Sequence, residues 1–392
     1  MRGLLAKVEQ ALGRRALVVG YAPGRINVIG EHTDYIGGLA LPAAIDRGVC
    51  VGLVRAKGAS TFQSVDEGGQ AERDATGPRV GDPNWLRYVA GALAEFCVAR
   101  PDVAVPAFHA AVAGDVPRGA GLSSSAALCV AMVRALSAWT RCSLSDAEVV
   151  AVARRVEHRW LGVHCGALDQ TASQCGRAGH LLRVDFRTAA VTPVPAPLDA
   201  LAWWVLDTGV RRSLAGSAYS ERVATVEQGL AQVRRRHPEV RHWRDLSADQ
   251  LSGLPVLAAR RLRHGITENE RVDAMVDALS RRDAPRAGAL LDASHASLRD
   301  DYGVSCPELD EMAAVARQMD GVYGARMVGA GFGGCVLALV DGTVEDGVPE
   351  TILDRYARAV GRRGAVHRLA VADGAKSWDR RNGAAGSKMR SW

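Results

Sequence analysis

Helix-like and strand-like patterns of apolar residues are interspersed along the whole chain. Apolar residues three and four positions apart predict helices at 3–15, 85–97, 126–139, 145–160, 213–236, 256–280 and 284–297, and from Pro307 to just before Gly321. Short apolar runs predict strands at 17–20, 39–45, 48–55, 107–112, 181–186 and 202–206. Residues 56–82 are polar and glycine-rich, which predicts a hairpin with a loop.

A proline-rich segment, Val191-Thr-Pro-Val-Pro-Ala-Pro197, interrupts this pattern and is the candidate connection between two domains. The chain has 392 residues, enough for two cores. We expect an N-terminal domain at 1–195 and a C-terminal domain at 196–377. Residues 376–392 are polar and aperiodic, so the end of the chain, 378–392 above all, is expected to be a loose tail.

Composition excludes several classes of protein. A content of 48% hydrophobic and 23% charged residues is ordinary for a globular protein. The net charge of +6 suits an anionic ligand, but the basic residues are scattered, so nucleic-acid binding is not expected. No apolar run is long enough to span a bilayer, and the first residues lack a signal-peptide core. The eight cysteines are dispersed, which indicates a reducing, cytoplasmic location.

The stretch Gly114-Asp-Val-Pro-Arg-Gly-Ala-Gly-Leu-Ser-Ser-Ser-Ala-Ala127 joins a predicted strand to a predicted helix. Its glycines allow close approach of a bound group, and its serines lie where a helix start has unpaired N–H groups. Such a start attracts an anion, and a hydroxyl there could ligate magnesium that accompanies phosphates. The serines could equally do no more than cap the helix.

A second unusual stretch, Ala22 to Gly38, packs charged and amide side chains between glycines, with little periodicity. Its Glu31-His-x-Asp34 cluster offers donors and acceptors at close quarters, which suits a polyhydroxylated ligand. His32 has no histidine partner four residues later, so zinc is not expected. A third stretch, His164 to Gly176, places Asp169 and Gln170 among small residues.

Near the C-terminus, Gly329, Gly331 and Gly334 spell the pattern G-x-G-x-x-G. A dinucleotide-binding loop should lead into a helix, whereas here an apolar, strand-like run follows. Residues 325–340 are therefore predicted to form two strands joined by a tight turn, and not a Rossmann site.

Together these stretches resemble the GHMP small-molecule kinases, and within them the branch that phosphorylates galactose. The resemblance lies in Gly24-Arg-Ile-Asn-Val-Ile-Gly-Glu-His-Thr-Asp-Tyr35, in Gly121-Leu-Ser-Ser-Ser-Ala-Ala127, in Gly329 to Gly334, and in Ser294 to Asp310. It implies an α+β fold with an N-terminal domain like ribosomal protein S5 domain 2 and a ferredoxin-like C-terminal domain. It also implies that ATP phosphorylates the anomeric 1-hydroxyl of galactose, with Mg2+, in a monomeric protein.

The resemblance implies roles for individual residues. Asp169 and Arg25 would be catalytic, with Asp169 orienting the sugar hydroxyl and accepting its proton. The sugar contacts would be Arg25, Glu31, His32, Asp34, Gly166, Asp169 and Tyr219. The nucleotide contacts would be Trp85, Gly119, Gly121, Leu122, Ser123, Ser124, Ser125 and Ala126, and the metal ligands Ser125 and Glu157.

Three departures from the usual motifs lie at Ile36, Ala167-Leu168 and Ala330, and the first two leave the choice of sugar open. The alternatives are a related sugar 1-kinase acting on N-acetylgalactosamine or arabinose, and a non-catalytic sugar sensor. Ser125-Ala126 is intact after the glycines, which favours catalysis.

Overall fold

The protein is described by a computed structural model that covers residues 1–117, 119–163, 165–196, 200–211 and 215–381, without the side chains of 215–219. The first half contains α1 (Arg2–Leu12), β1 (Val18–Asn27), η1 (Asp34–Ile36), β2 (Leu39–Ala40), β3 (Pro42–Arg55), β4 (Thr61–Ser64), β5 (Gln70–Glu72), α2 (Asn84–Ala99), β6 (Phe108–Gly114), α3 (Ser124–Thr140), α4 (Asp146–Leu161), α5 (Leu168–Cys175), β7 (His180–Asp185) and β8 (Ala190–Pro195). The second half contains β9 (Leu201–Asp207), α6 (Ala215–Arg236), η2 (Trp243–Asp245), η3 (Ala248–Leu251), α7 (Val256–Ser280), α8 (Ala284–Ser297), η4 (Leu298–Tyr302), α9 (Pro307–Arg317), β10 (Val322–Val328), β11 (Cys335–Asp341), α10 (Val348–Val360), β12 (Ala365–Leu369) and β13 (Lys376–Asp379).

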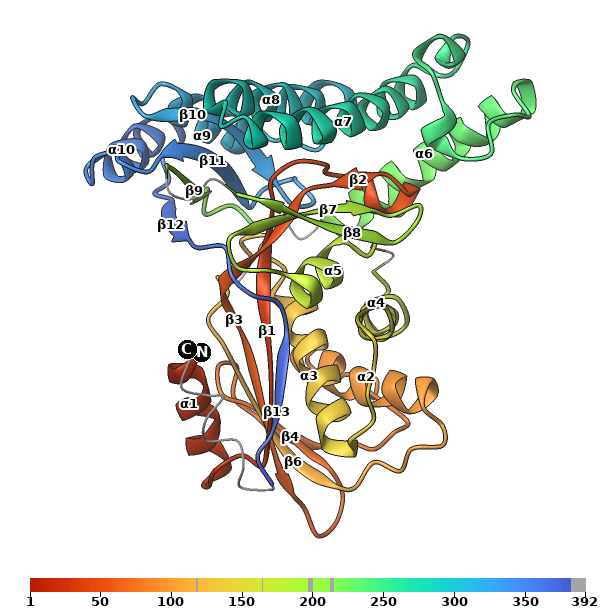
Figure 1. Ribbon diagram of the computed structural model, residues 1–392, viewed down its shortest axis with the longest axis vertical. Helices are drawn as coiled ribbons and strands as arrows, with labels where there is room; N and C mark the ends of the chain where they lie inside the picture. Colours follow the sequence, from red (N-terminus) through yellow and green to blue (C-terminus); the bar gives the residue numbers. More distant parts are fainter. Residues whose placement is uncertain (118, 164, 197–199, 212–214, 382–392) are drawn as a thin grey trace.

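The first sheet has six strands in the order β13-β1-β3-β6-β4-β5. Its long strands β1 and β3 run through the lower body of the molecule, with α1 on one side and α3 and α2 on the other (Figure 1). The main apolar core lies between this sheet and α2, α3 and α4, and a smaller one lies under α1. Each face of the sheet is therefore buried by helices with an apolar stripe.

The second half is built on a four-stranded antiparallel sheet in the order β10-β11-β9-β12. In Figure 1, α7 and α8 run across the top of the molecule and α10 lies to the left of β11. A three-stranded sheet, β2-β7-β8, lies between the two larger ones in the same view. One apolar cluster contains side chains from the first half, such as Ile26 and Leu181, together with Val205 and Leu337 of the second half. The two halves thus share a core.

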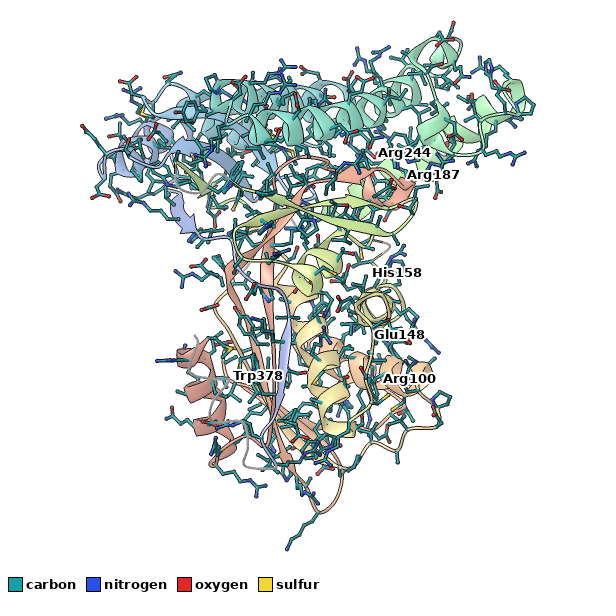
Figure 2. All side chains as sticks on the ribbon, in the orientation of Figure 1. Arg100, Glu148, His158, Arg187, Arg244 and Trp378 are labelled. Atoms are coloured by element: carbon teal, nitrogen blue, oxygen red, sulfur yellow. The ribbon has the colours of Figure 1, made fainter. Side chains whose placement is uncertain are left out.

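Polar contacts add to this junction. Arg244 in η2 donates to Oδ1 of Asp185 at the end of β7, at 2.8 Å, and Arg187 just after β7 donates to Oδ1 of Asp245, at 2.9 Å. Figure 2 shows Arg187 and Arg244 beside each other at this junction. Because the two pairs cross, each half supplies one arginine and one aspartate.

Most predicted helices form, and α4 begins at the predicted capping box, in which the side chains of Ser145 and Glu148 each bond the other's backbone. Glu148 also pairs with Arg100, next to the end of α2 (Figure 2). The glycine-rich segment 329–334 joins β10 to β11, as predicted, and no helix follows it.

Three predictions differ from the structure. The expected strands 39–45 and 48–55 are instead the short β2 and a continuous β3, because Asp46 and Arg47 expose their side chains without interrupting the strand. The proline-rich segment at 191–197 is no mere connection, since β8 reaches Pro195 and pairs with β7. The expected tail contains β13, in which Trp378 pairs with Val19 of β1 (Figure 2), while 382–392 lie outside the described residues.

Candidate active site

The turn that precedes α3 has the backbone conformation that its glycines allow. Gly119 and Gly121 have φ values of 66° and 73°, and Ser123 has the left-handed φ of 60°. Ser123 is the N-cap of α3, yet among the described contacts its hydroxyl does not bond the helix N–H groups. It donates instead to Oδ2 of Asp169, at 2.5 Å. This serine therefore connects the turn to a carboxylate.

Arg25 and Asp169 meet although they are 144 positions apart in the sequence. Arg25 follows the point where the register between β1 and β3 shifts, and its Nε and Nη2 lie 2.8 and 2.6 Å from Oδ1 of Asp169. Its Nη1 donates to the carbonyl of Gly121 at 2.5 Å. Asp169 lies in the first turn of α5 and faces the start of α3 through Ser123. The predicted proximity of Asp169 to Arg25 and to the serine-rich helix start is confirmed.

Asp34 lies against Gly166, where no side chain would fit. A Cβ at position 166 would overlap the Asp34 carboxylate, and the N–H of Leu168 donates to its Oδ2 at 3.3 Å. Burial raises the pKa of Asp34 to about 6, and the negative charge of Asp169 adds to the effect. The carboxyl group therefore changes its charge in mildly acidic solution.

Glu31 and His32 are buried and are held from the second half of the chain. Oε1 of Glu31 accepts from the N–H of Gly329 at 2.7 Å and pairs with Arg326 at 3.1 Å. Nε2 of His32 lies 3.3 Å from the carbonyl of Ala330, so it donates, because a carbonyl can only accept. Burial lowers the pKa of His32 to about 3, with His264 adding to the effect, so the ring is neutral.

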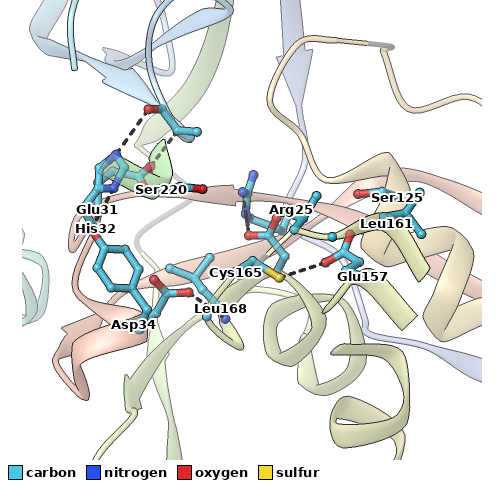
Figure 3. Close-up of a pocket in the computed structure, with 17 residues that line it drawn as sticks. Arg25, Glu31, His32, Asp34, Ser125, Glu157, Leu161, Cys165, Leu168 and Ser220 are labelled. Carbon is cyan, nitrogen blue, oxygen red and sulfur yellow. Dashed lines mark hydrogen bonds and ion pairs between the residues drawn. The ribbon is translucent and has the colours of Figure 1, made fainter. Parts of the chain in front are cut away.

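These groups line one cavity of about 560 Å³. In Figure 3, Glu31 and His32 lie at one end, Ser125 and Glu157 lie at the other, and Arg25 lies between them. The lining is drawn from both halves of the chain and consists of Arg25, Glu31, His32, Asp34, Tyr35, Ser125, Glu157, Leu161, Gly162, Val163, Cys165, Gly166, Leu168, Asp169, Ser220, Gly329 and Ala330.

Glu157 is buried at the end of the cavity where α3 begins. Its Oε2 accepts from the amide of Gln170 at 2.5 Å. It also accepts from the thiol of Cys165 at 3.1 Å (Figure 3). Burial raises the pKa of Glu157, and the charge of Asp169 adds to this effect. Oε1 of Gln170 is buried and has no hydrogen-bond partner among the described residues.

A second cavity, of about 280 Å³, adjoins the first at one residue. Ser125 lines both cavities. Trp85, Tyr88 and Leu128 give the second cavity a partly apolar wall, and Ser124 also lines it. This lining suits a flat aromatic group beside the start of a helix.

The structure brings most of the predicted site residues together, but in different ways. Arg25, Glu31, His32, Asp34, Gly166, Asp169, Ser125 and Glu157 line the first cavity, and Trp85, Ser124 and Ser125 line the second. The other predicted nucleotide contacts, Gly119, Gly121, Leu122, Ser123 and Ala126, form the turn and helix start without lining either described cavity. The side chain of Tyr219 lies outside the described residues.

Of the unusual positions, Leu168 and Ala330 line the first cavity, whereas Ile36 packs against the core of the second half. Sequence reasoning missed Tyr35, Cys165 and Ser220 as lining residues. It also missed Glu268 of α7, which accepts from the N–H of Gly30. The available signal was a charged residue on the apolar stripe of a predicted helix, since a buried charge needs a partner.

Comparisons with known proteins identify the class first. The family models for the GHMP kinases N terminal domain and the GHMP kinases C terminal match residues 87–177 and 275–356. The chain thus has the N-terminal and C-terminal domains of a GHMP small-molecule kinase. A third model, the Galactokinase galactose-binding signature, matches residues 8–54.

Individual proteins similar to this chain show which branch of the GHMP kinases it belongs to. The galactokinase of Roseiflexus sp. is 36% identical over 386 residues, covering 95% of each chain, and that of Chloroflexus aurantiacus is 37% identical over 373 residues, covering 92% of this chain and 93% of the relative. The crystal structure of Lactococcus lactis galactokinase complexed with galactose superposes with a TM-score of 0.86 at 29% identity, over 94% of this chain and 97% of that one. The chain therefore belongs to the galactokinase family.

Two further findings bear on the earlier expectations. Within the parts of the chain that the structure describes, no helix is both long and apolar enough to cross a membrane. The same parts contain no cluster of three or more histidine, cysteine or acidic side chains arranged to hold a metal. The expected metal ligands, Ser125 and Glu157, are only two side chains and so do not form such a cluster.

Proposed function

We propose that the protein transfers the terminal phosphoryl group of ATP to the anomeric hydroxyl of galactose. The observation that carries this proposal is the contact of Asp169 with Arg25 and Ser123, in a cavity that shares the lining residue Ser125 with a second cavity. Sugar and nucleotide would thus approach from opposite sides of one helix start. The galactose-bound relative of the same fold supports the choice of sugar.

Glu31, His32, Asp34 and the backbone at Gly166 would bind the sugar at one end of the cavity. A carboxylate such as Asp34 discriminates between epimers, because the wrong epimer leaves a buried polar group without its partner. Trp85 and Ser124 would contact the nucleotide, and Tyr219 and the turn at Gly119–Ala126 complete the proposed set. Phosphates would be favoured by the N–H groups at the start of α3.

Asp169 would orient the 1-hydroxyl and accept its proton as the phosphoryl group moves. The transition state of phosphoryl transfer is usually loose, so the hydroxyl needs little activation beforehand. Positioning and charge stabilisation then supply most of the rate, with Arg25 stabilising developing negative charge. The hydroxyl of Ser123 fixes the second carboxylate oxygen, which limits the rotation of Asp169.

The site also fits Mg2+, held by Ser125 and Glu157. The described side chains that line the first cavity include four acidic groups, Glu31, Asp34, Glu157 and Asp169, and one arginine, Arg25, so acidic groups outnumber basic ones in the lining. The thiol, amide and hydroxyl groups that hydrogen-bond Glu157 are all uncharged, and hard oxygen ligands suit magnesium. The ion would neutralise phosphate charge that this cavity would otherwise repel.

An ADP-release assay across galactose, glucose, N-acetylgalactosamine and arabinose tests the proposal. We expect turnover with galactose to exceed turnover with each other sugar. Asp169→Asn should lower kcat about 10²- to 10⁴-fold while ATP still binds. A chain that prefers another sugar, or an Asp169→Asn variant with normal turnover, would contradict the assignment.

A further inference from the structure

Helix α7 carries ionisable residues on the face that packs against the rest of the protein. His264 and Glu268 are both 0% exposed, one helical turn apart, and Val272 continues the same buried stripe. Helices normally bury apolar residues along such a stripe, so each buried polar group must be accounted for by its partners. Both residues have partners in the loop that follows β1.

Glu268 receives hydrogen bonds from that loop. Its Oε1 accepts from the N–H of Gly30 at 2.9 Å, from the N–H of Glu31 at 3.4 Å and from the hydroxyl of Ser294 at 2.7 Å. Its Oε2 pairs with Arg271 at 2.7 Å. Gly30 has a φ of 94°, and a Cβ there would meet the backbone of Leu39 and Ala40, so this backbone is both unusual and enclosed.

Two neighbours on α7 hold the same loop. Nε2 of His264 lies 3.1 Å from the carbonyl of Glu31 and donates to it, and Nδ1 lies 2.9 Å from the hydroxyl of Ser297. Oδ1 of Asn269 accepts from the N–H of Leu39 at 2.8 Å. Helix α7 thus bonds both ends of the loop between β1 and β3.

The result is that Glu31 is fixed at three places. Its N–H and carbonyl are held by α7, and its Oε1 is held by Gly329 and Arg326. Oε2 is the oxygen that these contacts leave for a ligand in the cavity. A shift of the backbone at Gly30 would therefore move the carboxylate of Glu31 and the side chains of His32 and Asp34 that follow it.

We propose that Glu268 is a positioning residue for sugar binding: its buried carboxylate anchors the backbone of the loop that carries Glu31, His32 and Asp34. This inference rests on the proposed function, since it assigns those three side chains to the sugar. Glu268 does not itself line the cavity and acts only through the loop. Its effect should therefore fall on the sugar and spare the nucleotide.

The charge of Glu268 is part of this role. Burial by itself would raise its pKa, but Arg271, His264 and Arg326 outweigh burial and lower the pKa to about 2. The carboxylate is thus ionised at working pH and can accept several hydrogen bonds at once. A carboxamide would keep one acceptor oxygen but would present an N–H group to Arg271 or to the loop.

The experiment compares Glu268→Gln with Glu270→Gln, which removes the same charge from an exposed position on the same helix. We expect Glu268→Gln to raise KM for galactose about tenfold or more, while KM for ATP changes less than about twofold. Glu270→Gln should leave both constants at the wild-type values. Equal increases in both KM values, or an unchanged KM for galactose in the folded variant, would overturn the proposal.

A second measurement does not depend on turnover. Amide hydrogen exchange of the ligand-free protein should be faster in Glu268→Gln than in Glu270→Gln for peptides that cover residues 28–33, with the core strands of the first sheet unchanged. Unchanged exchange at 28–33 would overturn the proposal, even if wild-type protein failed to phosphorylate galactose. If the wild-type protein does not phosphorylate galactose, the proposed function is rejected. The anchoring role of Glu268 is then decided by the hydrogen-exchange measurement alone.

Should Glu268→Gln fold poorly, Asn269→Ala provides the milder test. Asn269 is partly exposed and holds one N–H of the same loop. We expect a smaller rise in KM for galactose, about two- to fivefold, again without a change for ATP. No rise for galactose in this folded variant would count against anchoring by α7.

Discussion

Replacing Asp34 with asparagine should make the protein more stable and its sugar site worse. The carboxyl group of Asp34 lies in a buried setting beside the negative charge of Asp169, which together raise its pKa. Asparagine has nearly the same shape, and its carbonyl oxygen can still accept from the N–H of Leu168. The substitution therefore removes an unfavourable charge and keeps the hydrogen bond.

The magnitude follows from the pKa. A change from 3.8 to about 6 corresponds to about 3 kcal/mol of folding free energy lost above pH 7. Asp34 is partly exposed where it lines the cavity, so water there reduces this figure, and we expect a gain of about 1–2 kcal/mol in Asp34→Asn. For a chain of this size, that corresponds to a rise in Tm of about 1–3 °C.

The dependence on pH has a definite sign. Because the folded pKa is raised, the stability that the protonated group contributes is complete below about pH 4 and is lost as the pH rises through about 6. Asparagine does not titrate. The advantage of the variant should thus be largest at pH 7.5 and fall to about one third of that value at pH 4.5.

The assay is thermal unfolding of wild type and Asp34→Asn at both pH values, with Asp102→Asn as the control at an exposed position. At pH 7.5, KM for galactose should rise about tenfold or more in Asp34→Asn, because a charged acceptor is lost. A variant no more stable than wild type at pH 7.5, or a stability gain equal at both pH values, would refute the reasoning.

Three other substitutions or conditions test the rest of the site. Gly166→Ala should raise KM for galactose about tenfold or more by displacing Asp34, whereas Gly347→Ala, at an open position, should have no effect on kinetics. Trp85→Leu should raise KM for ATP several-fold without changing KM for galactose; Trp139→Leu, in the same core away from that cavity, should leave KM for ATP unchanged. Titration calorimetry should show ATP binding at least about tenfold more weakly in EDTA than with Mg2+, and equal affinities would argue against the metal.

The sequence predicts those parts of the site that consist of residues close together in the chain. Ser123 to Ser125 stand at the start of a helix whose apolar stripe is continuous, and the glycines before them mark the turn. Asp169 stands out because it interrupts a run of small residues. The proximity of these residues to Arg25 could be predicted only from the resemblance to a family, since no periodicity relates β1 to α5.

Other features depend on contacts that no local pattern records. The polar residues Asp46 and Arg47 resemble a break between strands, yet β3 continues because it pairs with β1 on both sides of them, and the N–H of Asp46 donates to the carbonyl of Ala370 at 2.9 Å. Lys376–Asp379 has little apolar character, and becomes a strand only because the edge of β1 is available to it. Tertiary pairing outweighs local preference in both cases.

The contacts of α7 with the loop that carries Glu31, His32 and Asp34 explain why the two halves of the chain must fold together to make one site. Gly30 and Glu31 belong to the first half, but the groups that satisfy their buried N–H groups and carbonyl come from α7 in the second. An isolated first half would leave these polar groups to water, and the loop would lose its fixed shape. Separating the halves would also expose the apolar cluster to which both contribute side chains, which is unfavourable in free energy. The geometry around Glu31 and Asp34 is therefore maintained by the same contacts that stabilise the fold.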